Sequence, residues 1–411
     1  MAYKNLEKFE RETINCSNCG QCVKGPVDPF RPNPIFTEYM PIKICPMHEN
    51  RGMLTYSANG MNAMGRAILE GKLEVTPDVV EAFYQCSLCG HCETNCGEVF
   101  HWIHTFLGKD IGEAIKTTDV VKSARADFVA MGCELPERVR KVTDPISKSH
   151  NRFGIDQAKK RDWLPGGITP TEGAEVLFFV GCIGSFRNRE IARNFVRILD
   201  KAGIPFNILG EEEWCCGGPQ LLNAGCVDLY QEHARHNVEA IRRSGAKKVV
   251  CTCADCYRTL KMDYPAVVGD LGFEVLHSAE YFANLLDEGK LVLDHPVNET
   301  ITFQDPCQLA RAAKVTEEPR KVLAAIPGLE LKEMQGNKEY TMCCGHYPVE
   351  LPESTALAGK NRLEAAAETG VSTLVTACSF CKWSLTDAVK KAENDYTVLD
   401  LTEIVAKAMG L

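Results

Sequence analysis

The sequence predicts an α/β protein in which a mainly α-helical N-terminal domain precedes a duplicated α/β unit. Three observations predict this class. Cysteines recur at offsets of 125 to 128 positions, the apolar β-rich runs "EVLFFVGC" and "ETITFQDPC" each end in a cysteine, and residues 1–140 are typical of helices joined by cysteine-rich turns. Such a pattern favours parallel sheets with ligands on the loops at the carboxyl ends of the strands.

The domain boundaries follow from composition and from the repeat. A chain of 411 residues is long enough for several domains, each with its own core. The expected division is a helical domain at 1–140, a connecting segment at 141–173, a first α/β repeat at 174–295 and a second at 296–411. The connection is rich in turn residues. The alignment of the two repeats is set by "GAKKVVCTCADC" at 245–256, which matches "GVSTLVTACSFC" at 370–381.

The 21 cysteines are the most unusual feature of the composition. The charged N-terminus "MAYKNLEKFERE" lacks the apolar run of a signal peptide, so we expect a cytoplasmic location where cysteines serve metal or redox chemistry. No apolar stretch reaches the roughly 18 residues of a membrane span, so any membrane attachment would come through a partner subunit. The formal charge of −9 argues against nucleic acid as a partner.

Two cysteine runs near the N-terminus predict iron–sulfur cubanes. "CSNCGQC" supplies Cys16, Cys19 and Cys22, and "CSLCGHCETNC" supplies Cys86, Cys89, Cys92 and Cys96. Three thiolates at two-residue spacing suit one corner of a [4Fe–4S] cubane, and in two-cluster proteins the fourth cysteine of a run ligates the other cluster. Cys96 would therefore complete the first triplet, and Cys45, which precedes Pro46, the second. The alternative is structural zinc, which also uses this spacing.

Each repeat supplies five further cysteines, including an adjacent pair. The first set is Cys182, Cys215, Cys216, Cys253 and Cys256, and the second set is Cys307, Cys343, Cys344, Cys378 and Cys381. Five thiolates exceed the need of a cubane, and adjacent thiolates suit a larger, more open cluster with bridging sulfur. A glycine follows each pair (Gly217 and Gly345), and we expect positive φ there so that the backbone can approach the cluster.

The spacing C-x(32)-C-C-G-x(35)-C-x-x-C, with 35 and 32 residues in its second copy, resembles the CCG domain. That domain marks the catalytic subunits of heterodisulfide reductase and its relatives. The whole chain is similar to the heterodisulfide reductase D subunits, which join a two-cluster ferredoxin-like domain to two CCG domains. The corresponding subunit of class II benzoyl-CoA reductase complexes shares this layout. The resemblance implies one noncubane [4Fe–4S] cluster per five-cysteine set, which makes those ten cysteines the catalytic centre.

The function implied by this resemblance is electron relay through two cubanes to two noncubane clusters that reduce a disulfide or related acceptor. The alternative is an electron-transfer or storage subunit, without a substrate of its own, in a larger complex. In one version of this alternative the complex is electron-bifurcating. A zinc scaffold without redox chemistry is the third reading. The chain has no G-x-G-x-x-G or phosphate-binding loop. Flavin and nicotinamide chemistry would therefore belong to partners: a flavoprotein, iron–sulfur or hydrogenase- or dehydrogenase-type subunits, or a membrane cytochrome.

Several residues near the two five-cysteine sets are not expected to be ligands. In "CCGHYPVE", His346 and Tyr347 depart from the family's glycine-rich stretch, so they either pack the turn or supply a proton donor. Arg311 and Lys382 are expected on the solvated surface, and Trp214 as a shield that keeps solvent from the cluster. The remaining cysteines, Cys133, Cys226 and Cys251, are expected to pack as buried thiols, with Cys251 beside a cluster.

Overall fold

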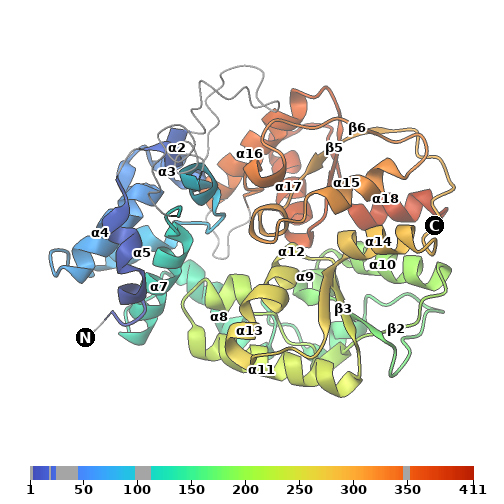
Figure 1. Ribbon diagram of the computed structural model, residues 1–411, viewed down its shortest axis with the longest axis horizontal. Helices are drawn as coiled ribbons and strands as arrows, with labels where there is room; N and C mark the ends of the chain where they lie inside the picture. Colours follow the sequence, from blue (N-terminus) through green and yellow to red (C-terminus); the bar gives the residue numbers. More distant parts are fainter. Residues whose placement is uncertain (1–2, 18–19, 25–44, 98–112, 346–351) are drawn as a thin grey trace.

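The computed structural model describes residues 3–17, 20–24, 45–97, 113–345 and 352–411. They form a helical N-terminal part and two α/β units, each built on a four-stranded parallel sheet (Figure 1). The predicted fold class is confirmed. Among the helices of these ranges, none combines the length and the apolar character needed to cross a bilayer.

The N-terminal part consists of short helices joined by capped turns. Its helical segments are η1 (Leu6–Phe9), α1 (Glu10–Asn15), α2 (Gln21–Lys24), α3 (Pro46–Arg51), η2 (Leu54–Tyr56), α4 (Ala58–Leu69), α5 (Pro77–Tyr84) and α7 (Thr117–Ala130). Ser57 and Thr76 begin α4 and α5, because their hydroxyl oxygens accept hydrogen bonds from the backbone N–H groups of Gly60 and Val79. Apolar side chains of these helices, Phe83 among them, form a core of their own.

The two α/β units share one strand order. The strands are β1 (Val176–Phe179), β2 (Phe206–Asn207), β3 (Lys248–Cys251) and β4 (Glu274–His277) in the first unit, and β5 (Thr300–Gln304), β6 (Glu330–Leu331), β7 (Thr373–Thr376) and β8 (Thr397–Asp400) in the second. The orders are β2-β1-β3-β4 and β6-β5-β7-β8, and every pairing is parallel. All four residues of β1 are buried, as expected for a parallel strand covered by helices on both faces.

Helices of the two units pack against one another and bring the units together. The first unit and its lead-in contain α8 (Glu137–Ser149), η3 (Gln157–Arg161), α9 (Gly181–Phe186), α10 (Arg189–Lys201), η4 (Gly210–Glu212), η5 (Gly218–Leu222), α11 (Val227–Ser244), α12 (Ala254–Arg258), η6 (Thr259–Asp263), α13 (Pro265–Val268) and α14 (Ser278–Asp287). The second contains η7 (Gln308–Ala312), α15 (Glu317–Ala324), η8 (Lys338–Tyr340), α16 (Pro352–Ala367), α17 (Ser379–Ala392) and α18 (Leu401–Ala408). Contacts between the units join α10 to α18, α14 to α15, α9 to α17 and α12 to η7, while α3 of the N-terminal part packs on α16. Helix α8 crosses the boundary expected at residue 140, and η3 lies inside the expected connection.

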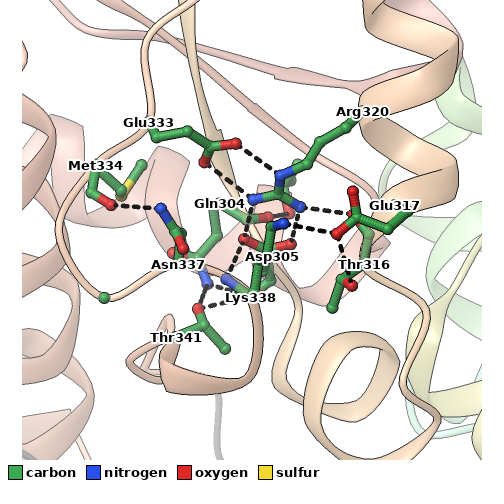
Figure 2. A network of polar contacts seen from close by, with 12 residues as sticks. Gln304, Asp305, Thr316, Glu317, Arg320, Glu333, Met334, Asn337, Lys338 and Thr341 are labelled. Carbon is green, nitrogen blue, oxygen red and sulfur yellow. Dashed lines mark hydrogen bonds and ion pairs between the residues drawn. The ribbon is translucent and has the colours of Figure 1, made fainter. Parts of the chain in front are cut away.

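A buried ion-pair network fixes the loop that leads to the second cysteine pair (Figure 2). The Asp305 carboxylate at the end of β5 is 1% exposed and accepts two hydrogen bonds from the Arg320 guanidinium, at 2.9 and 2.8 Å. Arg320 also binds the carboxylate of Glu333. The same Asp305 accepts a bond of 2.8 Å from the backbone N–H of Lys338, and its carbonyl oxygen accepts one from the Thr341 hydroxyl. The network therefore ties the 338–341 loop to the strand that precedes Cys307.

This network predicts a large loss of stability when its cation is removed. Arg320→Met leaves the Asp305 carboxylate buried without its partner, and we expect a loss of about 3–5 kcal/mol in the free energy of unfolding. Arg243→Met is the matched control, because Arg243 pairs with Glu212 and Glu239 on the surface and such pairs contribute ~0–1 kcal/mol. The measurement is anaerobic denaturation of both variants followed by circular dichroism. Equal midpoints for the two variants would contradict the stabilising role of the network.

Candidate functional site

The ten cysteines of the two sets lie at the carboxyl ends of parallel strands, where loops turn into helices. Cys182 and Cys253 follow β1 and β3, and Cys307 and Cys378 follow β5 and β7. This is the edge at which open parallel sheets hold their ligands. The π-helical segments η5, η6 and η7 follow closely on cysteines of the sets. Such segments are frequent at functional sites because they widen the local backbone.

The glycines after the cysteine pairs have the positive φ that the sequence predicts. Gly217 has φ 77° and Gly345 has φ 94°. Neither position could carry a side chain in this conformation without strain. At Gly345 a Cβ atom would also lie 2.4 Å from the carbonyl oxygen of Thr355, so α16 packs directly against the glycine. This close approach places the Cys343–Cys344 pair against the helix.

Within each repeat the five thiols form a continuous series of neighbours. Sulfurs within hydrogen-bonding reach of one another are, in order, Cys182, Cys215, Cys216, Cys256 and Cys253 in the first set and Cys307, Cys343, Cys344, Cys381 and Cys378 in the second. Each series visits equivalent positions of its repeat in the same order. The structure thus brings together all five members of each set expected from the sequence.

The two series meet at equivalent cysteines. The thiols of Cys253 and Cys378 lie within hydrogen-bonding reach of each other, and with a carboxylate oxygen of Asp255 they form a group whose atoms are all within 4.8 Å. Burial, reinforced by the neighbouring Cys253, raises the pKa of Asp255 to about 8. The two sets therefore adjoin at this junction and form one continuous series of ten thiols.

Packing so many thiols together makes their ionisation unfavourable without a positive centre. Hydrogen bonding to Cys343 and burial raise the pKa of Cys307 well above that of a free thiol, and hydrogen bonding to Cys344 and Cys378 does the same at Cys381, with burial adding to it. The opposite direction occurs at Cys216, whose pKa falls to about 7 because Cys215 and Cys256 donate to it. Iron ions would neutralise such thiolates, so the donor set fits the expected iron–sulfur clusters.

A buried cation accompanies each set. Lys160 and Glu213 are 1% and 0% exposed and form an ion pair of 3.2 Å, while Glu213 accepts bonds of 2.8 Å from the backbone N–H groups of Val180 and Gly181. Burial opposes the charge of Lys160, but Glu213 and Cys182 together raise its pKa, so it remains a cation.

Arg362, on α16 of the second repeat, is the buried cation near the second set. Its guanidinium is fully buried, donates to the carbonyl oxygen of Gly336 at 3.1 Å, and lies near Cys343, Cys344 and Cys381. Burial lowers the pKa of Arg362 to about 10, which keeps it charged at neutral pH. Arg362 therefore places positive charge beside the second set, whereas the charge of Lys160 beside the first set is already balanced by Glu213.

Several N-terminal cysteines lie close to one another. Burial raises the pKa of Cys45, and the thiols of Cys86, Cys89 and Cys22 lie close enough to raise it further. Cys92 joins the same group. The backbone N–H of Ile115 donates to the Cys96 sulfur at 3.5 Å, and Cys16 is partly buried, whereas Cys19 lies outside the described residues. The division of these eight cysteines between two cubanes stays a prediction.

Two buried arginines clamp the Cys86–Cys92 loop to the α/β units. Arg125 donates to the carbonyl oxygens of Cys86 at 2.6 Å and of Asn223 at 2.7 Å. Arg311 donates to the carbonyl oxygens of Cys89 at 2.5 Å and of Glu339 at 2.9 Å, and also to that of Thr341. These contacts join the ferredoxin-like part to both repeats.

The expected surface position of Arg311 is wrong. Its side chain is 7% exposed because three carbonyl groups from two domains surround the guanidinium. Lys382 is also mostly covered, since it forms an ion pair with Glu403. The groups that bind Arg311 and Lys382 lie far from them in the sequence. The burial of these two cations therefore could not be predicted from the residues around the cysteines.

The residues outside the sets have packing roles in the part of the chain that the structure describes. Cys251 ends β3 and is fully buried, and Cys133 and Cys226 pack against the N-terminal core. Trp214 stacks between the rings of His150 and His236 at centroid distances of 3.6 and 3.7 Å, and its role as a shield of the cluster stays a prediction. His346 and Tyr347 lie outside the described residues.

Comparison with known protein families identifies the parts of the chain. A model described as a cysteine-rich domain, CCG, matches residues 176–261 and 301–386. A second model, described as a 4Fe-4S dicluster domain, matches residues 12–98. Both matches fall on the parts that the sequence predicts, and they establish iron–sulfur binding as the property of these domains.

Curated relatives match over nearly the whole chain. The D subunit of the dihydromethanophenazine:CoB–CoM heterodisulfide reductase of Methanosarcina barkeri is 35% identical, over 99% of this chain and 97% of that protein. A probable iron-sulfur-binding oxidoreductase of Bacillus subtilis is 31% identical over 86% of this chain and 50% of its own length. The EtfAB:quinone oxidoreductase of Syntrophomonas wolfei is 28% identical over 99% of this chain and 60% of its own length.

The close approach at Gly345 predicts that a single methyl group will damage the second set. In Gly345→Ala the Cβ atom meets the Thr355 carbonyl, so we expect the Cys343–Cys344 pair to shift and about a quarter less iron per chain, the share of one cluster in four. Gly370→Ala is the control: it has a similar positive φ but open space around it, so its cost is backbone strain alone, about 1 kcal/mol. Iron and acid-labile sulfide assays of both proteins, purified without oxygen, make the comparison. Equal iron contents would show that the close approach does not position the pair.

Proposed function

The chain belongs to the family of the heterodisulfide reductase D subunits, which are iron–sulfur oxidoreductase subunits, and we propose that it relays electrons through two [4Fe–4S] cubanes to two noncubane clusters. Cys16, Cys19, Cys22 and Cys96 would hold one cubane and Cys45, Cys86, Cys89 and Cys92 the other. Each five-cysteine set would hold one noncubane cluster. The observation that carries this proposal is the unbroken series of ten buried or nearly buried thiols across both repeats.

Contacts between the parts support an order for the relay. Cys89 lies close enough to Cys343 to act on its ionisation, and Arg311 joins the backbone at Cys89 to the loop before Cys343. We therefore infer that electrons leave the N-terminal part at the Cys86–Cys92 loop and enter the second set. The Cys253–Cys378 junction then leads to the first set.

The proposed reaction is reduction of a disulfide to two thiols, which consumes two electrons and two protons. The clusters would supply these electrons one at a time and offer iron as the partner of a substrate sulfur. The chain's own residues hold the thiolates in place, offset their charge through Arg362, and keep water from nine of the ten sulfurs by burial. Electron donors among the partners (a flavoprotein, another iron–sulfur or dehydrogenase-type subunit, or a membrane cytochrome) would supply the electrons in the cytoplasm.

One observation favours the second candidate function, an electron-transfer or storage subunit without a substrate. All five cysteines of the first set and four of the second are buried, so most of the proposed cluster surface is closed to solvent. A subunit of this kind would exchange electrons with partner subunits only. The two candidates differ in one testable respect, namely whether a small thiol can reach iron in the protein.

Electron paramagnetic resonance (EPR) of anaerobically purified, oxidised protein distinguishes the two candidates. With disulfide chemistry we expect a new paramagnetic signal on addition of a small thiol, and its loss in Cys343→Ser or Cys215→Ser identifies the set that produces it. Iron for four clusters without any thiol-dependent signal would favour the relay-only candidate. Colourless protein that contains zinc would refute both.

The proposed electron order predicts a specific defect in Arg311→Met. This variant loses the contacts that hold the Cys89 loop against the loop before Cys343, so we expect slower oxidation of the N-terminal clusters by the two sets at unchanged iron content. Arg311→Lys should restore part of the rate. Arg242→Met is the control, since Arg242 also donates to carbonyl oxygens, those of Leu271 and Asp270, but contacts no N-terminal residue through them. Stopped-flow reduction followed by freeze-quench EPR measures the rate. A wild-type rate in Arg311→Met would mean that electrons enter elsewhere.

A further inference from the structure

We propose that His91 of the N-terminal part and Arg362 of the second repeat donate hydrogen bonds to sulfur of the cluster held by the second five-cysteine set, and that these donors raise its reduction potential. The inference rests on the proposed function, which assigns a cluster to that set. It adds a residue from outside the repeat to the surroundings of that cluster, and it requires no particular substrate.

His91 is a buried imidazole whose ring nitrogens have no partner. The side chain is 1% exposed, and neither Nδ1 nor Nε2 makes a hydrogen bond within the described residues. Buried polar groups are almost always paired, so an unpaired one indicates a group that would bind beside it. Imidazole carries at least one N–H in every protonation state, so what His91 needs is an acceptor.

Two cations flank His91, and neither of them can be that acceptor. Burial lowers the pKa of His91 well below its usual range, and Arg311 and Arg362 lie close enough to lower it further. The preceding Gly90 packs against the stem of Arg311, since a Cβ atom there would lie 3.5 Å from Cδ of the arginine. Guanidinium groups donate hydrogen bonds and do not accept them. A donor that lies between two fixed positive charges favours an anionic acceptor.

Arg362 has an unused donor of its own. Its terminal nitrogens donate to two backbone carbonyl groups and to the Met334 sulfur, but Nε has no partner among the described residues. The Asp305 carboxylate lies near Arg362 but is already bound by Arg320. Three thiols of the second set also lie near Arg362, namely Cys343, Cys344 and Cys381. The anionic group beside Arg362 would therefore be the cluster on these thiolates.

The loop that carries His91 lies against the same set. Cys89 of this loop lies close to Cys343. Arg311, which donates to the Cys89 carbonyl oxygen, also lies near Cys307. The two cations that flank His91 are thus the cations beside the thiols of the second set. His91 and Arg362 therefore bring two unpaired donors, from different domains, to one cluster.

Hydrogen bonds to the sulfurs of a cluster favour its reduced state. One-electron reduction adds negative charge to the cluster, and donors to its sulfurs stabilise that charge and raise the potential. A cation that is buried beside the cluster acts in the same direction. Loss of either donor should therefore make electron transfer from the N-terminal part into the second set less favourable.

The test is an anaerobic redox titration of the holoprotein followed by EPR. The titrating component that is absent from Cys343→Ser belongs to the second set. In His91→Leu this component should be reduced about tenfold less readily, which for one electron is a potential lower by about 59 mV, at wild-type iron content. His91→Gln keeps an N–H and should restore part of the shift. An unchanged potential in His91→Leu, or a shift confined to the N-terminal clusters, would overturn the proposal.

Variants of Arg362 test the second donor. Arg362→Met removes both the charge and the Nε–H, so the potential of the second set should fall by at least as much as in His91→Leu. Arg362→Lys keeps the charge and should give a smaller decrease. Lys360→Met is the matched control, because Lys360 lies on the same helix but is 68% exposed and pairs with Glu364. A decrease of equal size in Lys360→Met would contradict a role of the Arg362 hydrogen bond.

A second measurement separates failure of this inference from failure of the proposed function. In protein labelled with ¹⁵N-histidine, pulsed EPR should detect a weak nitrogen coupling to the second-set cluster, and His91→Leu should abolish it. A histidine that only fills space would produce no such coupling. If Cys343→Ser removes neither iron nor a titrating component, the second set holds no cluster and the proposed function falls. A cluster there with neither the shift nor the coupling refutes this inference alone.

Discussion

The structure depends on one electrostatic constraint: ten thiols meet at the junction of two repeats, where they cannot all ionise unless positive charge is present. Buried parallel strands lead into the loops that carry these thiols, positive-φ glycines let the backbone come close, and the buried Arg362 adds a cation that no solvent screens. Each of these features is costly in isolation, since buried charge and strained backbone both disfavour folding. They are compatible with a stable protein because the metal centres they surround would bind the thiolates strongly, so that cluster assembly and folding support each other.

Duplication explains the order of the sulfurs, and the N-terminal part explains why the two sets differ. Both series follow the same order, and they join at Cys253 and Cys378, which are equivalent positions of the two repeats. An approximate symmetry of this kind would make the sets interchangeable. The ferredoxin-like part contacts the two sets unequally, because Cys89 lies close to Cys343 of the second set and Arg311 donates to carbonyl oxygens of Cys89 and of the second repeat. The first repeat meets the same loop through Arg125, which donates to the carbonyl oxygens of Cys86 and Asn223.

The sequence predicted what is local or periodic. The α/β class, the duplication and the positive φ of Gly217 and Gly345 follow from spacing and residue type, and the structure confirms them. Contacts between distant segments could not be predicted in this way: Arg311 was expected in solvent, although three carbonyl groups from two domains bury it. The burial of Arg125 could have been predicted from the sequence, because Val121 and Phe128 place it on the apolar face of α7. Its carbonyl partners could not, because they come from other helices and loops.

The stoichiometry of the proposed reaction gives a reason for two adjoining sets. A disulfide accepts two electrons, whereas iron–sulfur clusters deliver one at a time, so a second electron must be held close to the site while the first is used. In the proposed relay the second set receives electrons from the N-terminal part, because Cys89 lies close to Cys343. The first set is buried and meets the second through Cys253 and Cys378. In the proposed mechanism the first set would hold the electron that completes the reaction, so relay and storage would belong to one mechanism divided between the two repeats.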